Sequence, residues 1–339
     1  MARFSFAQFG NDLYTGKRSY NFVGRRKIWY IVAAVMILAS ILIPAARGGF
    51  VLGIEFTGGS EFQIAGLADN PDQTIATDAV NEEVPNSAPR VSVVGENAVR
   101  VQTDQLEQAE SDGLVEALAA AYDVPTENVT ASFIGPSWGA DITGSAIRAL
   151  IVFVILAAIV MALYFRTWKM SVAAVISLVH DIVITAGVYG ILGFEVTPSA
   201  VIGFLTILGY SLYDTVVVFD KIRENTTEDG PESGRTFAES VNLAVNQTLV
   251  RSINTGVVAA LPVAAILFIG AYVLGAGTLR DIALSLFIGI LIGTYSTIFI
   301  AAPFYSQMRE NEPDLKKREI RLRQAKQAST VSTAASVSK

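Results

Sequence analysis

An acidic residue lies deep inside an apolar stretch of this chain that is long enough to cross a membrane. The stretch runs from Val201 to Glu224, and Asp214 stands well inside its apolar part. An ionisable group at that depth costs about 2.5–3.5 kcal/mol on insertion scales, so it marks an ion path, a proton relay or a paired site. The residue type and its position therefore predict proton-transfer chemistry at Asp214.

Further ionisable residues stand in the two neighbouring apolar stretches. Asp181 lies near the middle of the preceding stretch, next to His180, which is the only histidine of the chain, and Arg251 opens the following stretch. We predict a proton relay in which Asp214 has Arg251 as its basic partner and Asp181 is a second acid. Because neighbouring helix positions differ by about 100°, Asp181 and His180 are not expected to face one cavity.

Polar neighbours of these residues are the expected support of the relay. Tyr210 and Ser211 precede Asp214 by four and three positions and share its helix face, and Thr255 follows Arg251 at helical spacing. Other interpretations remain open. Asp214 and Arg251 could form an inert ion pair, Arg251 could reach to the membrane interface, and His180 could be a buried hydrogen-bonding group without a role in the relay.

The composition argues for a membrane protein and against most enzyme classes. Hydrophobic residues make up 52% of the chain and charged residues 17%, and there is no cysteine. Disulfides and thiolate nucleophiles are therefore excluded, and a single histidine makes a histidine-based metal site untenable. Gly58-Gly59 is not followed by the Lys-Ser/Thr of a phosphate loop. We expect no enzyme activity, cofactor, metal or nucleic-acid binding.

Six apolar runs are long enough to cross about 30 Å of hydrocarbon at 1.5 Å per residue. They are Ile28–Ala46, Gly144–Phe165, Met170–Leu192, Thr197–Phe219, Val250–Leu274 and Ile282–Tyr305. We expect an all-α membrane bundle with its first helix at 28–46, its other five within 144–305, and flanking segments 1–27 and 306–339. Residues 220–246 are expected to form a loop with a turn at Thr226–Gly234, followed by a helix that carries Phe237, Val241, Leu243, Ala244 and Leu249 and runs on into span five. Gln327–Lys339 is expected to be disordered.

Lysine and arginine gather on one side of the predicted bundle. They cluster before the first span, between spans two and three, and after span six, whereas Gly48–Thr143 holds only Arg90 and Arg100 beside sixteen acidic residues. The positive-inside rule then predicts that both termini are cytoplasmic in the plasma membrane and that residues 47–143 lie on its outer side. The first apolar run is expected to be a retained span, because no cleavage site follows it.

Residues 47–143 are expected to form a folded α+β domain. Alternating hydrophobicity and turn residues predict four strands and two helices: Glu61–Ala65, Ile75–Val84 (helix), Arg90–Val94, Ala98–Gln102, Gln105–Ala121 (helix) and Val129–Ile134. The order β-α-β-β-α-β is that of the ferredoxin-like split motif. An acidic extracytoplasmic module of this kind is a candidate for contact with exported polypeptide, or is simply a solvated domain without a ligand.

Local motifs in a fixed order along the chain carry a family resemblance. They are Phe9–Gly16, Gly53–Gly59, Ile134–Ser137, His180-Asp181, Gly209–Asn225 and Gln247–Thr255. With these motifs the chain resembles the SecF family of protein-export membrane proteins over nearly its whole length. Glu55 stands where this family more often has Asp, and Tyr213 where Asn is common, so the fine geometry near Asp214 stays open.

The resemblance implies a function and a set of partners. It implies one half of a proton-driven, twelve-span device that is related to the RND transporter superfamily and whose other half is SecD. The device is expected to work beside the SecYEG channel and SecA on unfolded preprotein, at the expense of the proton gradient. The motifs also imply that Asp214 is the proton-relay acid and that Arg251 is its basic partner.

Two rival functions stay open from the residues alone. One half of an RND-type, proton-coupled transporter for a small lipophile would use the same relay beside a different partner. An intramembrane aspartyl protease would use Asp181 and Asp214 as its dyad. The second acid lacks the Gly-x-Gly-Asp setting of such proteases, however, and Arg251 would ionise a dyad that has to share a proton.

Overall fold

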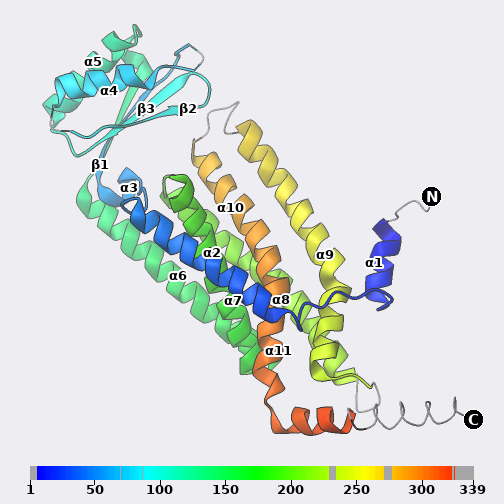
Figure 1. The fold of residues 1–339 in the computed structure, drawn as a ribbon. Coiled ribbons are helices and arrows are strands. Elements are labelled where there is room, and N and C mark those ends of the chain that lie inside the picture. Colours follow the sequence, from blue (N-terminus) through cyan, green and yellow to red (C-terminus); the bar gives the residue numbers. More distant parts are fainter. Residues whose placement is uncertain are drawn as a thin grey trace, which may run out of the picture.

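The computed structural model describes residues 6–68, 70–85, 87–228, 234–270, 277–322 and 324. The prediction for Gln327–Lys339, the end of the predicted fifth span beyond Gly270, and residues 229–233 of the predicted turn lie outside this part of the chain. The described residues form a long helical bundle with a small sheet domain (residues 59–134) at one end (Figure 1).

Six helical segments are long and apolar enough to cross a membrane, and they coincide with the six predicted spans. The helices are α2 (Arg26–Ala46), α6 (Pro136–Phe165), α7 (Trp168–Leu192), α8 (Pro198–Glu228), α9 (Phe237–Ala265) and α10 (Gly277–Ser296). The fifth segment continues in a π-helical turn, η3 (Ile266–Gly270), and the sixth in a second one, η4 (Thr297–Ala301), followed by α11 (Ala302–Glu310). A predominantly helical membrane bundle is thereby confirmed.

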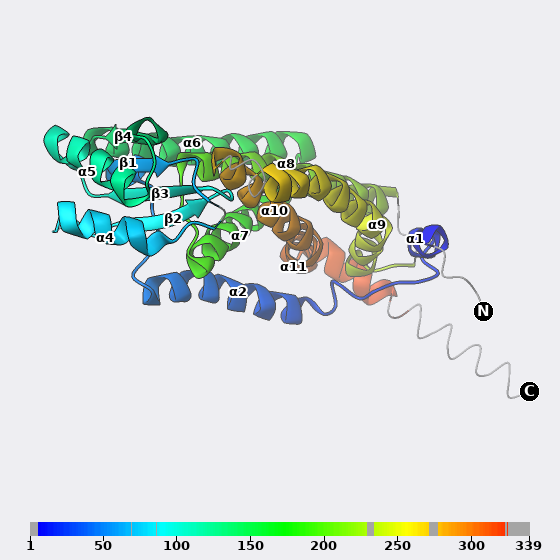
Figure 2. The same cartoon turned by 90° about the horizontal axis from the view of Figure 1, so that it is seen from above.

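The helices surround α7 and α8. Helix α7 packs between α2 and α6, while α8 contacts α7, α9 and α10 (Figure 2). A short helix that the sequence did not predict, α1 (Phe6–Tyr14), packs against α9. Because the number of spans is even, α1 and α11 lie at the same end of the bundle, away from the sheet domain (Figure 1). This end carries most lysines and arginines and is called the basic end below.

The first part of the loop predicted at 220–246 is helical, which corrects that prediction. Helix α8 continues to Glu228, so Thr226 lies in a helix and not in a turn. The helix predicted to run from Phe237 into the fifth span is confirmed, because α9 begins at Phe237 and continues to Ala265. The extension is held by tertiary contacts that hydrophobicity does not reveal. Ile222 is fully buried, and the Asn225 side chain donates a hydrogen bond of 2.9 Å to Gln247 Oε1 on α9.

The sheet domain has the predicted order of elements. It consists of β1 (Gly59–Ile64), α4 (Gln73–Glu83), β2 (Arg90–Val94), β3 (Ala98–Thr103), α5 (Gln108–Ala121) and β4 (Val129–Ile134). The strands are antiparallel in the order β2-β3-β1-β4. Alternate strand residues such as Phe62 and Val101 are fully buried against Leu114 and Leu118 of α5. Helices α4 and α5 lie on the side of the sheet away from the bundle (Figure 1).

Small residues let the spanning helices approach closely. A Cβ atom placed on Gly187 of α7 would lie 2.1 Å from the Cβ atom and 2.6 Å from the Cα atom of Ser40 on α2. Between α8 and α10, Gly203 approaches Ser285, and Gly289 approaches Ile207. Close backbone approach of this kind gains van der Waals contact, which drives helix association where lipid removes the hydrophobic effect.

We predict that Gly187→Ala destabilises the bundle by about 1–3 kcal/mol, the usual cost of overpacking. The added methyl group collides with the backbone of Ser40, so α2 has to move away from α7. Thermal unfolding of the detergent-solubilised protein measures the effect. The control is Gly144→Ala in α6, where, in the described part of the chain, no atom other than the adjacent residues and the nearby backbone of the same helix lies within 4 Å of the new methyl group. Equal melting temperatures for the two variants would contradict close packing at Gly187.

Candidate functional site

The predicted relay acid, Asp214, is buried between α8 and α9. Its residue is 5% exposed, and Ser252 Oγ of α9 donates a hydrogen bond of 2.8 Å to its Oδ1 atom. The second carboxyl oxygen, Oδ2, is buried and has no hydrogen-bond partner in the described part of the chain. One oxygen is therefore fixed by a neighbouring helix while the other remains open to a proton or a donor.

Arg251, the predicted basic partner, lies beside this site but does not contact it. The residue is exposed, and within the described residues it makes no ion pair with Asp214 at 4.0 Å or less. Ser252, which follows Arg251 in the sequence, takes the place next to the carboxyl group. Its polar side chain stands out in the apolar run, but a single sequence does not show that it pairs with Asp214, because the contact depends on how α8 and α9 pack.

Asp181 is completely buried on α7, where the sequence placed a second acid. Ser211 Oγ of α8 donates a hydrogen bond of 2.6 Å to Asp181 Oδ2, and His180 Nδ1 lies 3.2 Å from Asp181 Oδ1. The expectation that His180 and Asp181 point to different sides is therefore wrong, since the two buried side chains meet. The other ring nitrogen, His180 Nε2, has no partner among the described residues. The centroids of the His180 and Tyr295 rings lie 6.1 Å apart.

The remaining predicted support residues have different surroundings. Ser211 contributes by binding Asp181 rather than Asp214, although it lies one turn before Asp214 on the same helix. Tyr210 and Thr255 are half-buried, and neither makes a hydrogen bond to the two acids within the described part. Helix α8 thus presents two polar groups within one turn. Its Ser211 hydroxyl bonds to the acid of α7, and its Asp214 carboxyl accepts a bond from the hydroxyl of α9.

Hydroxyl pairs continue this polar interior toward the sixth span. Ser177 Oγ lies 2.9 Å from Ser296 Oγ, and Thr215 Oγ1 lies 3.1 Å from Thr297 Oγ1, with all four residues fully or almost fully buried. The second contact falls at the start of the π-helical turn η4. Single π-helical turns inside α-helices are frequent at functional sites. The acids of α7 and α8 are therefore part of a polar layer that reaches α10.

Sequence reasoning missed a third buried acid, Asp281 of α10. It is 6% exposed, and Thr197 Oγ1 donates a hydrogen bond of 2.9 Å to its Oδ2 atom, while Tyr189 of α7 bonds to its main-chain oxygen at 2.9 Å. Arg280 lies 3.4 Å from Oδ1. Asp281 directly precedes the run predicted as span six, so it counted as a boundary residue. The pair Thr197-Pro198, which opens the fourth apolar run, is typical of the N-terminus of a helix. It was the available sign that polar groups at this helix end need hydrogen-bond partners.

A polar junction ties the sheet domain to the membrane bundle. Gln102 of β3 donates hydrogen bonds to Glu61 Oε2 of β1 at 3.0 Å and to Glu195 Oε1 at 2.8 Å, and Glu195 belongs to the turn between α7 and α8. Arg100 lies 3.6 Å from Glu61 and 3.8 Å from Glu195. Backbone bonds between residues 51–53 and Val196 complete the connection. These four side chains are called the junction below.

Glu55 lies next to the junction with one unpaired oxygen. It belongs to the short helix α3 (Ile54–Thr57), and its buried Oε2 atom has no hydrogen-bond partner in the described part of the chain. Burial is the largest influence and raises the pKa of the Glu55 carboxyl. The carboxylates of Glu195 and Glu61 raise it further, whereas its own backbone hydrogen bond and Arg100 act in the opposite direction.

The site brings together buried carboxyl groups and hydroxyl groups. In the described part of the chain, no group of three or more histidine, aspartate or glutamate residues is placed to hold a metal ion. The two carboxyl groups of Asp181 and Asp214 do not bond to each other in the described structure; each bonds to its own serine. Spanning helices with buried acids and one small sheet domain define a multi-pass membrane protein.

Comparison with known proteins identifies the family. Residues 114–311 match the family described as "Protein export membrane protein SecD/SecF, C-terminal". The chain is 46% identical over 308 residues to the protein translocase subunit SecF of Streptomyces coelicolor, covering 91% of this chain and 81% of the relative. It is 39% identical over 313 residues to SecF of Mycobacterium tuberculosis (strain CDC 1551 / Oshkosh), covering 89% and 70%. The chain belongs to the SecF family of protein-export membrane proteins.

Solved structures of a longer relative share the fold. The crystal structure of SecDF, a translocon-associated membrane protein from Thermus thermophilus, has a TM-score of 0.75 and 28% identity, covering 87% of this chain. This chain spans only 39% of that SecDF chain. SecDF in its super-membrane-facing form gives a TM-score of 0.60 at the same 28% identity, with 92% of this chain covered.

We predict that Glu55→Gln raises the stability of the protein at neutral pH. Because the folded state raises the pKa of Glu55, the stability that this group contributes is full below the pKa of the unfolded chain and is lost as the pH rises through the folded value. The glutamine variant has no charge to bury, so its melting temperature exceeds that of the wild type at pH 7.5. The difference vanishes near pH 4.

The control for this prediction is Glu96→Gln, which removes an exposed acid from the turn between β2 and β3. Thermal unfolding in detergent at pH values between 4 and 8 measures both variants. A Glu55→Gln protein that follows the wild type at every pH would show that the Glu55 carboxyl carries no burial penalty.

Proposed function

We propose that this chain is the SecF half of a proton-driven protein translocase. With SecD it uses the proton motive force to promote translocation of unfolded preprotein at the outer face of the SecYEG channel, next to SecA. The SecF relatives and the SecDF fusion structure support the partnership with SecD. The observation that carries the proton coupling is the half-satisfied carboxyl group of Asp214.

The two oxygens of Asp214 suit reversible protonation. Ser252 holds Oδ1, and a proton on the open, buried Oδ2 atom would remove the charge that burial penalises. We assign the described arrangement to the protonated form. When Asp214 loses its proton, Arg251 needs only to turn in from its exposed position, since it neighbours Ser252 in the chain. Arg251 thus acts as a reversible counter-ion, and Asp181 with Ser211 passes protons on the other side of α8.

The energy available from protons suffices for a domain movement. One charge that crosses 100 mV is worth about 2.3 kcal/mol, so a few protons in each cycle can drive a rearrangement of packed helices. We propose that α8 and α9 change their relative position when Arg251 replaces the proton. The turn between α7 and α8 carries Glu195, so a shift of these helices reaches the sheet domain through the junction.

We propose that the sheet domain is the part of the protein that moves. Its antiparallel order β2-β3-β1-β4, with both helices on one face, supports a domain of the ferredoxin-like type. The two solved SecDF forms differ in their likeness to this chain, with TM-scores of 0.75 and 0.60 at equal identity. This difference supports a fold with more than one arrangement, as rigid rotation of the domain requires.

The proposed orientation follows the distribution of charge. Lysine and arginine gather at the basic end of the bundle, and acidic residues dominate the sheet domain. The positive-inside rule therefore supports a plasma-membrane protein with both termini in the cytoplasm and the sheet domain outside. In this orientation the sheet domain meets preprotein as it leaves the channel.

We predict that Asp214→Asn abolishes the gain in export that a proton gradient produces. Inverted membrane vesicles that contain the variant, SecD and SecYEG are supplied with SecA, saturating ATP and a preprotein, with and without a gradient. The amide cannot ionise, so the variant exports at the gradient-free rate under both conditions, while the wild type gains. Arg251→Ala is expected to lose the same gain.

The matched control is Asp220→Asn, which removes an exposed acid from the same helix. It should keep the full response to the gradient. Immunoblots check that all variants reach equal amounts in the membrane. If Asp214→Asn responds to the gradient as the wild type does, Asp214 is a structural group and the proton path lies elsewhere, with Asp181 the next residue to test.

A further inference from the structure

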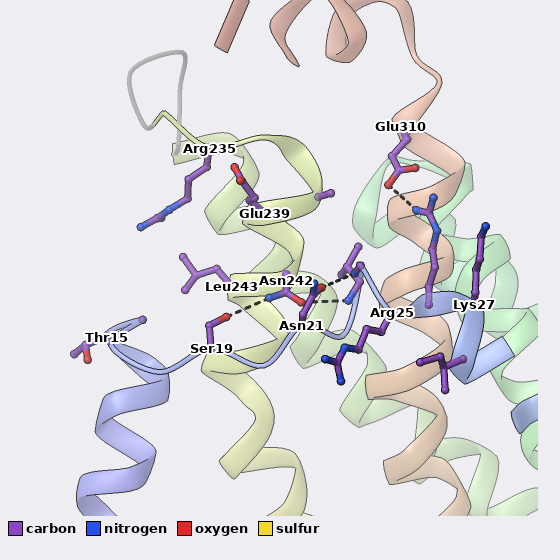
Figure 3. Close-up of a pocket in the computed structure, with 16 residues that line it drawn as sticks. Thr15, Ser19, Asn21, Arg25, Lys27, Arg235, Glu239, Asn242, Leu243 and Glu310 are labelled. Carbon is purple, nitrogen blue, oxygen red and sulfur yellow. Dashed lines mark hydrogen bonds and ion pairs between the residues drawn. The ribbon is translucent and has the colours of Figure 1, made fainter. Parts of the chain in front are cut away.

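A large cavity opens at the basic end of the bundle, away from the buried acids. Its volume is about 970 Å³, and it lies between the start of α2, the segment that joins α1 to α2, and the start of α9 (Figure 3). Four basic and two acidic residues line it: Arg25, Arg26, Lys27, Arg235, Glu239 and Glu310. The lining therefore carries an excess of positive charge.

Both acids of the cavity are already engaged by the protein. Glu310 Oε1 lies 2.5 Å from Arg26 Nη1, so these two charges neutralise each other. Glu239 accepts a hydrogen bond of 2.7 Å from the backbone N–H of Thr236 in a capping box at the start of α9. Arg25 and Lys27 are exposed and form no ion pair within 4.0 Å in the described part of the chain. Two cations therefore remain available to a ligand.

The segment that carries these cations is held in place by α9. Asn242 Oδ1 accepts hydrogen bonds from the backbone N–H groups of Phe22 at 2.8 Å and Val23 at 3.2 Å, and its amide donates to Tyr20 O at 2.9 Å. The fully buried Asn246 accepts a further bond from the Tyr20 backbone at 2.7 Å. A binding site gains affinity when its groups are ordered before the ligand arrives. Arg25 is thus presented by an ordered loop.

The N-terminal end of α2 adds to the attraction for an anion. Arg25 is the N-cap residue of α2, and no side chain caps this end of the 21-residue helix. Two of the first N–H groups of α2, those of Arg26 and Ile28, already bond to backbone oxygens. The dipole of a long helix still favours negative charge at its N-terminus. In Figure 3, Arg25 and Lys27 extend to different sides of the start of α2. The cations therefore flank the cavity from two directions.

The cavity continues into an apolar surface along the first span. Ile28 lines the cavity and is 52% exposed, and Ile31 and Val35 follow at helical spacing with 64% and 59% exposure. A free phosphate ion would use only the polar part of this surface. A phospholipid would place its headgroup in the cavity that Arg25 and Lys27 line, and would lay an acyl chain along the exposed stripe of α2.

We propose that this cavity binds the headgroup of an anionic phospholipid. The site lies where α2 enters the membrane, so its ligand comes from the same leaflet of the bilayer. Basic residues at the membrane surface each contribute attraction to anionic lipid, and a pocket between spans adds a fixed geometry. The bound lipid holds the segment before α2 against α9 and thereby fixes the first span to the fifth. This role is independent of proton transfer at Asp214.

The test measures lipid retention by native mass spectrometry of the purified full-length chain in detergent. Phosphatidylglycerol and phosphatidylcholine are titrated separately, and inorganic phosphate is added as a competitor in a third arm. The double variant Arg25→Gln/Lys27→Gln is compared with Lys316→Gln/Lys317→Gln, which removes the same charge from two exposed lysines outside the cavity. The charge-preserving variant Arg25→Lys/Lys27→Arg checks that the segment still folds.

We expect the wild type to retain phosphatidylglycerol in preference to phosphatidylcholine, and the cavity variant to bind it about tenfold more weakly or worse. The lysine control and the charge-preserving variant should bind as the wild type does. Equal losses in both glutamine variants would show general surface electrostatics and overturn the site. Equal retention of both lipids would also overturn it, and so would displacement of the lipid by millimolar phosphate, which would identify a plain anion site.

Discussion

A carboxyl group that is buried among membrane-spanning helices needs a hydrogen-bond donor, and the arrangement of this bundle follows from that requirement. No water is available in hydrocarbon, so an unsatisfied polar group costs several kcal/mol. Asp181 takes its donor from α8 and Asp214 takes its donor from α9. Each acid therefore fixes the rotation of its own helix relative to the next, and α8 is held from two sides. The same bonds leave Asp214 Oδ2 without a hydrogen-bond partner in the described part of the chain, and His180 Nε2 is likewise unpaired there.

A second set of polar contacts holds the sheet domain to the bundle, at the end away from the basic end. It is joined covalently to α2 and α6, yet Glu195, from the turn between α7 and α8, reaches both Gln102 and Arg100 of β3. Arg90 of β2 adds a bond to the main-chain oxygen of Leu52. These contacts are ionic and amide hydrogen bonds rather than a hydrophobic interface. Such contacts exchange with water at modest cost, which is compatible with the change of domain position in the proposed function.

The sequence predicts those parts of the structure that repeat with a regular period. Apolar length identifies the spans, and alternation with turn residues identifies the strands of the sheet domain within one or two residues. Asp214 and Asp181 stand out because a charge in an apolar run is costly. The pairing of these acids with serines could not be predicted in full. Ser211 was expected to support Asp214 and instead bonds to Asp181, and the contact of Ser252 with Asp214 arises from the packing of separate helices. Arg251 was predicted to be the partner of Asp214 because of its charge, but the neighbouring Ser252 makes the contact with Asp214. Asp281 was overlooked because it stands at the edge of an apolar run, and the helical extension of α8 depends on tertiary contacts of Ile222 and Asn225.

Close glycine contacts join the spanning helices in pairs. Gly187 brings α7 to near backbone contact with α2, and Gly203 and Gly289 bring α8 close to α10. The bond from Ser211 to Asp181 crosses between these two pairs, and the bond from Ser252 to Asp214 crosses from the second pair to α9. Both acids thus lie where separate helices meet, so a change in their charge acts on the contact between helices rather than on the interior of one closely packed pair.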